Sequence, residues 1–422
     1  MSLAHGIDEW MIVVQKRRIK AVQRLYDRSV RAAKIGFLPM ARLYRRSLTR
    51  TRFIGITGSC GKTTTKFLIG AVLNTRYVGL VSPRGRNRAG GMLRTLFKLR
   101  RRHAFCVAEL GAFGPGTLDE LLGTLEPDVG VVTNVGSDHL SAFGGLDEVA
   151  REKRKLPLSL PADGCAVLNG DDARVHDMAS HTLARVLLFG CASHNDLIAE
   201  NVSSRWPERL TFQIAYRGSR FPVRTQLCGE HWVYAVLAAL GVGLTMGVPL
   251  EESIDAVLRV PPFSRRMQPF SLGSDIAWIR DDWKASSWTV PAALRFLESA
   301  RARRRILVLG QVSDDRTRPS RLYPRIVREA RSVADEVCLF GRWAHHGLKA
   351  RQGEDDRSIL VFPSARELVP YLERTLRRGD LLYVKASGRH DPSIDAAFSG
   401  RFWSRAGQLS PVDSTPGPLR DP

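Results

Sequence analysis

Lys62 and Thr63 stand at the start of a helical stretch, behind two closely spaced glycines and a short apolar segment at 53–57. The backbone N–H groups of such a turn converge on a phosphate, the lysine reaches the outer phosphates, and the hydroxyl suits magnesium. The spacing is one residue off the common count unless Ile56 is taken as the first position. The segment predicts a phosphate loop with ATP as the leading ligand. Its expected nucleotide contacts are Gly58, Ser59, Cys60, Gly61, Lys62, Thr63 and Thr64.

The elements around this loop predict an α/β chain with a mostly parallel sheet in a P-loop ATPase domain and a smaller Rossmann-like domain after it. Beyond Pro261-Pro262, strand patterns at 305–309, 336–340, 358–362 and 380–384 alternate with helical stretches, which indicates a second, doubly wound sheet. We expect four parts: a basic amphipathic helical arm (1–51), the ATP-binding domain (52–262), the C-terminal domain (263–408) and a disordered tail (409–422).

Composition excludes several classes of protein. A chain of 422 residues with 44% hydrophobic residues can bury a real core, so it is not disordered, collagen-like or a disulfide scaffold. The apolar run at 233–248 is interrupted by glycines and is shorter than a bilayer span, so we expect a buried helix. Six scattered cysteines without a Cys-x-x-Cys pair, and the lack of a hydrophobic signal segment, predict a cytoplasmic protein.

The first 52 residues carry 13 basic and 3 acidic side chains, although the whole chain has a net charge of +22. Apolar residues recur there at helical spacing between Val22 and Phe37. An amphipathic arm can pack its apolar stripe on the body of the protein, which we favour, or make weak contact with anionic lipid at the inner membrane surface. No recognition motif for nucleic acid follows, so we expect no specific nucleic-acid partner.

Residues 55–65 resemble the phosphate loop of the Mur ligase family, the ATP-dependent amide-forming enzymes of peptidoglycan precursor synthesis. Further segments are similar to that family at 105–112, 127–140, 150–153 and 160–172, so that the resemblance covers roughly residues 53–400. The similar subgroup is the one that adds D-alanyl-D-alanine. The resemblance implies a ligase that joins a carboxylate to an amine through an acyl phosphate, with ATP and Mg²⁺ as cofactors.

Four residues are implied as metal ligands by this resemblance. Thr63 and Glu109 would hold one Mg²⁺, and His139 with a carbamylated Lys153 would serve a second, because oxygen ligands suit magnesium. Lys62, His139 and Lys153 are the implied catalytic residues. Taken singly, Glu109 also fits an ion pair at a strand end, His139 a hydrogen bond to the backbone, and Lys153 a solvated cation.

The remaining implied nucleotide contacts are scattered along the chain. They are Asn87, which also fits a turn, His231, the linker residue Arg266, and Asp281. The sequence departs from the family pattern at three of the surrounding positions. Lys155 replaces a glutamate and adds positive charge near Lys153, while Trp232 and Ala235 replace two asparagines of the adenine segment. An aromatic residue there predicts stacking on the base in place of hydrogen bonds to it, with weaker discrimination between ATP and GTP.

A basic segment of only about fifty residues precedes the phosphate loop, where the family has a domain for the UDP-sugar. We therefore expect substrates that resemble a cell-wall precursor or another amino-acid-containing acid, rather than the housekeeping precursor. Two alternatives are a nucleotide-binding scaffold without turnover and a basic-arm adaptor at a membrane. Cys60 adds a hypothesis: at a helix N-terminus beside Lys62, its pKa should be low and its thiol reactive, unless it is only a small residue that fits.

Overall fold

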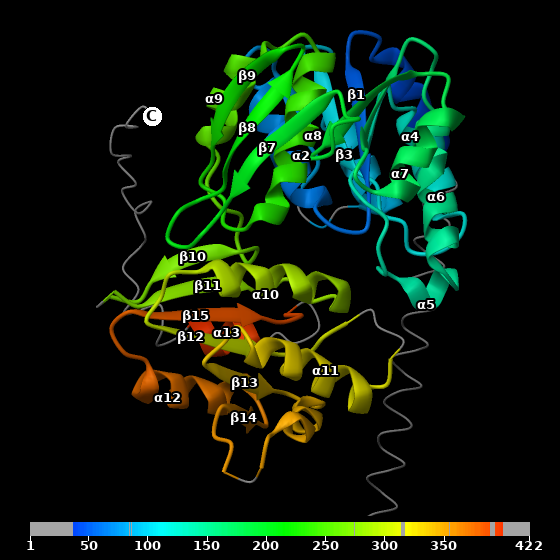
Figure 1. Ribbon diagram of the computed structural model, residues 1–422. Coiled ribbons are helices and arrows are strands. Elements are labelled where there is room, and N and C mark those ends of the chain that lie inside the picture. Colours follow the sequence, from blue (N-terminus) through cyan, green and yellow to red (C-terminus); the bar gives the residue numbers. More distant parts are fainter. Residues whose placement is uncertain are drawn as a thin grey trace, which may run out of the picture.

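The computed structural model describes residues 37–83, 85, 87–273, 275–313, 317–353, 355–388 and 393–399 (Figure 1). Two sheets, one in each half of the chain, confirm the predicted α/β class. The predicted tail and residues 1–36 of the predicted arm lie outside the described residues. The predicted domain boundaries stay predictions, although the two sheets lie on either side of the Pro261-Pro262 pair.

The first sheet has nine strands in the order β2-β3-β1-β4-β5-β6-β7-β8-β9. Neighbouring strands from β2 to β7 run parallel, and the β7-β8-β9 end is antiparallel. The strands are β1 (Arg52–Thr57), β2 (Gly79–Val81), β3 (Phe105–Glu109), β4 (Val129–Val132), β5 (Cys165–Asn169), β6 (Arg185–Gly190), β7 (Leu197–Ser203), β8 (Thr211–Tyr216) and β9 (Ser219–Arg224). The helices are α2 (Lys62–Leu73), α3 (Ala89–Leu96), α4 (Thr117–Leu125), α5 (Leu140–Phe143), α6 (Leu146–Leu158), α7 (Ala173–Asp177), η1 (Met178–His181), η2 (Glu230–Trp232), α8 (Val233–Thr245) and α9 (Leu250–Leu258).

The second sheet has six strands in the order β10-β11-β15-β12-β13-β14, parallel except for the β10–β11 pair. Its strands are β10 (Gln268–Ser271), β11 (Ala277–Asp281), β12 (Arg304–Leu309), β13 (Glu336–Phe340), β14 (Ile359–Phe362) and β15 (Asp380–Lys385). Its helices are η3 (Ser287–Thr289), α10 (Val290–Ser299), α11 (Pro319–Arg331), η4 (Ala344–Ala350), α12 (Ala365–Thr375) and α13 (Ser393–Ser399). The four predicted strands of this half are β12 to β15, to within a residue at each end.

Alternation along the central strands divides the core into two layers. Ile54 and Ile56 of β1 pack on the side of α2 and α8, whereas Phe53 points to the layer that contains α3, α4 and α6. Helix α8 is buried along most of its length, as its apolar run predicts, and within the described ranges no helix is both long and apolar enough to cross a membrane. The α2 and α8 layer continues through Phe263 and Met267 into the core beneath α10 and α11. The two halves of the chain therefore share an apolar core.

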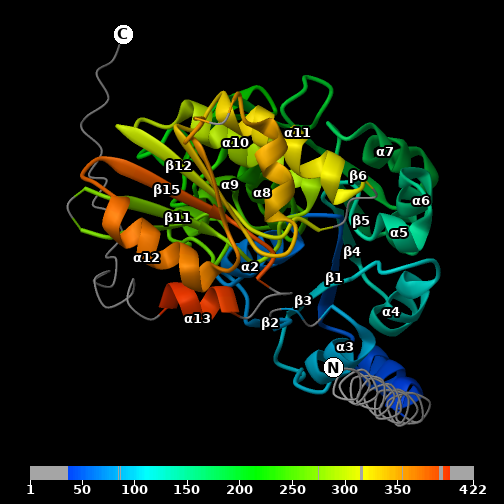
Figure 2. The same cartoon turned by 90° about the horizontal axis from the view of Figure 1, so that it is seen from below.

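The described end of the predicted arm, helix 37–47 and the residues after it, packs against the central domain (Figure 2). Ala41 and Leu48 are buried, the Tyr44 hydroxyl donates to the Leu99 carbonyl at 2.8 Å, and Arg46 pairs with Glu126. These contacts agree with the packed alternative for this part of the arm.

Candidate active site

The phosphate loop lies between β1 and α2, at the carboxyl end of the parallel strands, where α/β proteins bind ligands. Gly58 has φ 147°, and a Cβ there would lie 1.9 Å from the Thr133 hydroxyl of the neighbouring loop, so no larger residue fits. The Oδ1 atom of Asn134 accepts hydrogen bonds from the N–H groups of Ser59 and Cys60, at 3.0 and 2.8 Å. The loop after β4 thus holds the phosphate loop in place.

Asn134 occupies two N–H groups of the loop, so the N–H groups at the start of α2 are the ones available to a phosphate in this conformation. The first N–H groups of a helix have no partner within the helix, and Gly61 enters α2 with φ 82°. The first turn of α2 carries no acidic residue. The Thr64 hydroxyl is buried without a hydrogen-bond partner in the described part of the chain, and Lys62 donates to the carbonyl of Gly58. This end of α2 is suited to an anion.

Glu109 lies at the end of β3 and accepts from the Thr63 hydroxyl at 3.0 Å. Burial raises the pKa of Glu109, but Lys66 at 3.2 Å, Lys62 and the Thr63 hydrogen bond outweigh it, so the pKa lies below its ordinary value. Glu109 is therefore ionised. The guanidinium of Arg266 reaches Thr63 at 3.3 Å from the linker between the domains. The predicted pair Thr63 and Glu109 is thus brought together, and Arg266 joins it.

His139 begins α5 in a left-handed conformation, with its Nε2 atom 3.5 Å from Asp138. Asp138 is buried, and Lys284 of the second domain pairs with it. Burial raises the pKa of Asp138, but Lys62, Lys284 and His139 lower it by more, so the net pKa is below the ordinary value. A carboxylate that sequence reasoning overlooked therefore links His139 to the second domain.

Lys153 is 2% exposed within α6. Burial, with the charge of Lys62, lowers its pKa to about 7, although Asp138 and Glu152 act in the opposite direction. The predicted extra charge of Lys155 does not reach this site: Lys155 pairs with Asp119 at 2.8 Å and with Glu152 at 2.9 Å. Near neutral pH, much of Lys153 carries an uncharged amine.

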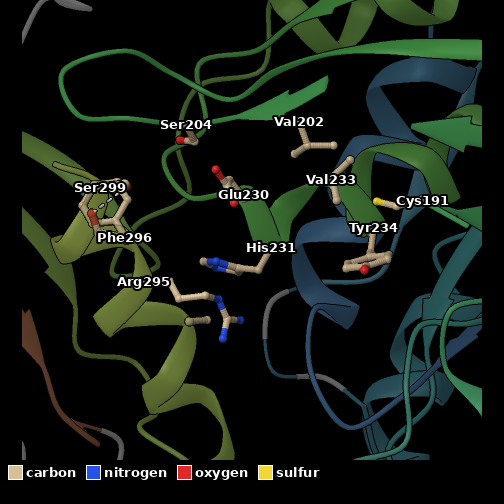
Figure 3. A pocket seen from close by; sticks show the side chains of 11 residues that line it. Cys191, Val202, Ser204, Glu230, His231, Val233, Tyr234, Arg295, Phe296 and Ser299 are labelled. Atoms are coloured by element: carbon tan, nitrogen blue, oxygen red, sulfur yellow. Dashed lines mark hydrogen bonds between the residues drawn. The ribbon is translucent and has the colours of Figure 1, made fainter. Parts of the chain in front are cut away.

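A cavity of about 220 Å³ lies between the two domains, and His231 forms part of its lining (Figure 3). Burial lowers the pKa of His231 to about 4, so this ring is neutral. Figure 3 shows the side chains around the cavity, which come from β6–β7, from η2–α8 and from α10. They are Cys191, Val202, Ser204, Glu230, His231, Val233, Tyr234, Ala292, Arg295, Phe296 and Ser299. Apolar side chains and hydrogen-bonding side chains contribute to this lining in similar measure, a mixture that offers a heterocyclic base both contact area and hydrogen-bond partners.

Charged groups connect the phosphate loop to this cavity. Lys385 acts electrostatically on Cys60 in the loop and on His231 at the cavity. It also pairs with Asp281, to which the Tyr383 hydroxyl donates at 3.0 Å. Asp281, His231 and the loop, all predicted nucleotide contacts, therefore lie within electrostatic reach of Lys385. Asn87 lies beside the segment that follows β3: its carbonyl accepts from Gly111 N–H at 3.0 Å.

Two hypotheses about individual residues are wrong. The pKa of Cys60 is raised, because burial outweighs the opposing charges of Lys62 and Arg266, so this thiol is not activated. Trp232 is buried in the core and does not line the cavity; Tyr234 and Phe296 are the aromatic residues that line it together with His231. In both cases the outcome depends on burial by residues that are distant in the sequence, which the neighbouring residues of the chain do not reveal.

Sequence reasoning also overlooked Lys66 and Asn134. Lys66 lies one helical turn after Lys62 and is fully buried against Glu109, so helical spacing was the available signal. Asn134 comes two residues after β4, and polar residues at the carboxyl end of a parallel strand point toward a ligand site. Asp138 stands beside His139, and a buried acidic neighbour of a histidine is a common pairing.

Lys284→Met should destabilise the protein by about 1–3 kcal/mol at neutral pH, because it leaves the buried carboxylate of Asp138 without its partner across the domains. The estimate lies below that for a fully buried pair, since a quarter of the Lys284 side chain is exposed. Methionine keeps an apolar side chain of similar length, so the change in the free energy of unfolding, measured with urea, reports mainly the loss of the charge. Lys349→Met, at an exposed lysine, serves as the control. Equal unfolding midpoints for both variants would show that the pair contributes nothing.

Comparison with known proteins agrees with this geometry. The Mur ligase middle domain matches residues 56–243, and the Mur ligase glutamate ligase domain matches residues 265–388. The chain is 32% identical over 378 residues to the UDP-N-acetylmuramoyl-tripeptide--D-alanyl-D-alanine ligase of Mycobacterium tuberculosis, covering 84% of this chain and 73% of that protein. The enzyme of the same name from Bacillus subtilis is 28% identical over 358 residues, covering 82% of this chain and 75% of that protein.

Solved structures share the fold. MurF from Acinetobacter baumannii superposes with a TM-score of 0.77 at 22% identity, covering 86% of this chain and 80% of that one. MurF ligase from Thermotoga maritima, solved in complex with ADP, superposes with a TM-score of 0.76 at 21% identity, covering 87% and 84%. With the phosphate loop and the two matched domains, these findings show that the chain belongs to the Mur ligase family of ATP-dependent amide-forming ligases.

Proposed function

We propose that this ligase joins the carboxylate of an amino-acid-containing, peptidoglycan-precursor-like substrate to the amine of an amino acid or short peptide. The observation that carries the proposal is the meeting of both domains at the phosphate loop, where Arg266 reaches Thr63 and Lys284 reaches Asp138. A carboxylate oxygen takes the γ-phosphoryl group of ATP and ADP leaves. The amine then attacks the carbonyl carbon, phosphate is expelled, and the amine loses a proton.

The residues at the loop fit magnesium. Thr63 offers a hydroxyl and Glu109 an ionised carboxylate, 3.0 Å apart, and hard oxygen ligands are what magnesium prefers. A carbamate on Lys153 would add an oxygen ligand beside Asp138 and His139, and an uncharged amine is the form that reacts with carbon dioxide. When bound, the metal would neutralise charge on the transferred phosphoryl group. Lys62 would hold the same phosphate and Arg266 would close on it from the linker.

The substrate class rests on the relatives. Those reported above are named for adding D-alanyl-D-alanine to a UDP-N-acetylmuramoyl-tripeptide. We infer a substrate of the same chemical kind, a peptide with a free carboxylate, in the cytoplasm where ATP is available.

Coupled phosphate release tests the function. The enzyme is supplied with Mg-ATP and with pairs of acid and amine, beginning with the UDP-muramoyl tripeptide and D-alanyl-D-alanine and continuing with lipid-linked and sugar-free peptides. Release that requires both partners, with an amide product detected by mass, supports the proposal. Release by ATP alone, or nucleotide binding without release for every pair, would favour the scaffold alternative.

The base of the nucleotide should occupy the cavity beside His231, and Cys191 makes this measurable. Cys191 is the exposed cysteine among the six and lines the cavity. Burial and Asp171 raise the pKa of its thiol, so labelling should proceed at mildly alkaline pH, ahead of Cys60. We expect Mg-ATP to slow labelling of Cys191 about tenfold in peptide mapping. Unchanged labelling at saturating ATP would place the base elsewhere.

A further inference from the structure

The amino ends of the central strands carry a surface that the ligase site does not use. It is formed by helix 37–47, residues 48–52, Val78 and residues 97–102, and we call it the amino-edge surface. The phosphate loop lies at the opposite, carboxyl end of β1. Figure 2 shows helix 37–47, in dark blue, beside α3.

Specific contacts hold these segments together as one surface. The rings of Tyr44 and Phe97 stack at 6.2 Å between centroids, and the Tyr44 hydroxyl donates to the Leu99 carbonyl. Thr51 donates to the His103 carbonyl at 2.6 Å, and Ala104 N–H donates to the Val78 carbonyl at 2.8 Å. The segments come from three separate parts of the chain and are fixed against one another.

The surface is strongly basic. Residues 37–52 and 97–102 contain nine basic side chains and no acidic one. Arg45, Arg46 and Arg52 pair with Glu126 or Asp128. For the other six, no ion pair with a carboxylate is found in the described part of the chain; they are Arg42, Arg50, Lys98, Arg100, Arg101 and Arg102. All six are exposed, so their positive charge faces outward.

Large apolar side chains lie exposed among these charges. Met40 is 57% exposed, Leu43 69% and Val78 63%, with Phe37 and Phe97 also open to solvent. Five of the eight exposed large hydrophobic residues of the described chain therefore belong to this one surface. Scattered apolar residues are ordinary on a protein surface, but clustering of this kind marks an interaction site.

We infer that the amino-edge surface binds an anionic lipid bilayer, with the exposed apolar side chains of helix 37–47 entering the headgroup region. Six outward-facing cations complement acidic headgroups, and Met40 and Leu43 supply the apolar contact that an interfacial helix makes. A nucleic acid would use the cations but gains little from aliphatic side chains. A second copy would bring the same positive charge into contact with itself, which is repulsive.

Binding to the bilayer at this edge leaves the phosphate loop, at the other end of the strands, facing away from the membrane. The inference is separate from the proposed function, because none of these residues touches the ligase site. Turnover of soluble substrates should therefore be unchanged in variants of this surface, and failure of one proposal leaves the other standing.

Sedimentation of the full-length chain with vesicles tests the inference. One variant combines Arg100→Gln, Arg101→Gln and Arg102→Gln; a second combines Met40→Ser and Leu43→Ser. The matched control combines Arg366→Gln, Arg374→Gln and Arg377→Gln, three exposed arginines of the other domain with the same change in net charge. Vesicles contain phosphatidylglycerol with phosphatidylcholine, or phosphatidylcholine alone, at low ionic strength. Thermal melting checks that each variant is folded.

We expect the unmodified chain to bind only the anionic vesicles. The arginine variant should bind about 100-fold more weakly, from the contribution of a basic residue at such a surface. The serine variant should bind about tenfold more weakly, because it loses apolar contact, and the control should bind as the unmodified chain does. Equal losses of binding in the arginine variant and in the control would show that only net charge matters. Full binding by the serine variant would point to a polyanion rather than lipid as the partner. Either result, or no binding to anionic vesicles, overturns the inference.

Discussion

Lys62→Ala should lower the rate of ATP turnover about a thousandfold while the protein melts at an unchanged temperature. Lys62 is the first residue of α2, and its ammonium turns back to the phosphate loop, where it donates to the Gly58 carbonyl. Removal of one preorganised charge at a transferred phosphoryl group costs about 10²–10³ in rate, and loss of phosphate binding adds to it. The side chain is not part of the apolar core, so folding should be unaffected.

The matched control is Lys349→Ala, at an exposed lysine of η4, which should keep full turnover. Coupled phosphate release and differential scanning fluorimetry measure the two properties on the same samples. Turnover near the unmodified rate in Lys62→Ala would refute the assignment of the phosphate loop. A lowered melting temperature in that variant would instead show that Lys62 has a structural role.

Lys153→Ala should lower ligase turnover about a hundredfold or more, and acetate should restore part of it by filling the space with a carboxylate. Lys153 is buried, and its pKa of about 7 makes the uncharged amine available for carbamylation. Lys155→Ala, two residues along the same helix, should keep turnover, because Lys155 pairs with Asp119 and Glu152 away from the site.

Carbon dioxide and pH provide the direct readout of the modification. The protein without substitutions should lose activity when carbon dioxide is removed and regain it when bicarbonate is added. Bicarbonate labelled with ¹³C should give a carbamate signal by NMR. Because the amine is protonated below a pKa of about 7, the signal should weaken as the pH falls through that value. Full activity in Lys153→Ala, or no carbamate signal at alkaline pH, would reject this role for Lys153.

The same pKa has a consequence for stability. Without a carbamate, Lys153 has a pKa of 10.5 in the unfolded chain and of about 7 in the folded protein. Burial of the charged amine therefore lowers the free energy of unfolding below pH 7, and this cost is relieved as the pH rises from 7 to 10.5. The unfolded state binds more protons across this range, so the free energy of unfolding should rise with pH there. Lys153→Met should flatten this rise in chemical unfolding curves.

The sequence by itself determined the local parts of this protein. The apolar segment before Gly58, the turn and the helix that begins at Lys62 form one continuous stretch, and each step depends on residues a few positions apart. Four of the six strands of the second sheet, β12 to β15, were likewise predictable, because alternation of apolar strands with helical stretches is a local pattern, whereas β10 and β11 were not predicted. The family resemblance drew on such segments and located Thr63 and Glu109 before their contact was known.

Only the tertiary structure decided which groups meet. Lys66 against Glu109, Asn134 on the phosphate loop and Lys284 on Asp138 join positions that are 43 to 146 residues apart. The pKa values depend on those meetings: burial raises that of Cys60 although Lys62 stands two positions away, and it lowers that of Lys153. Burial and charge act through space and are not ordered along the chain, so sequence patterns predict the elements and the folded structure alone sets their electrostatics.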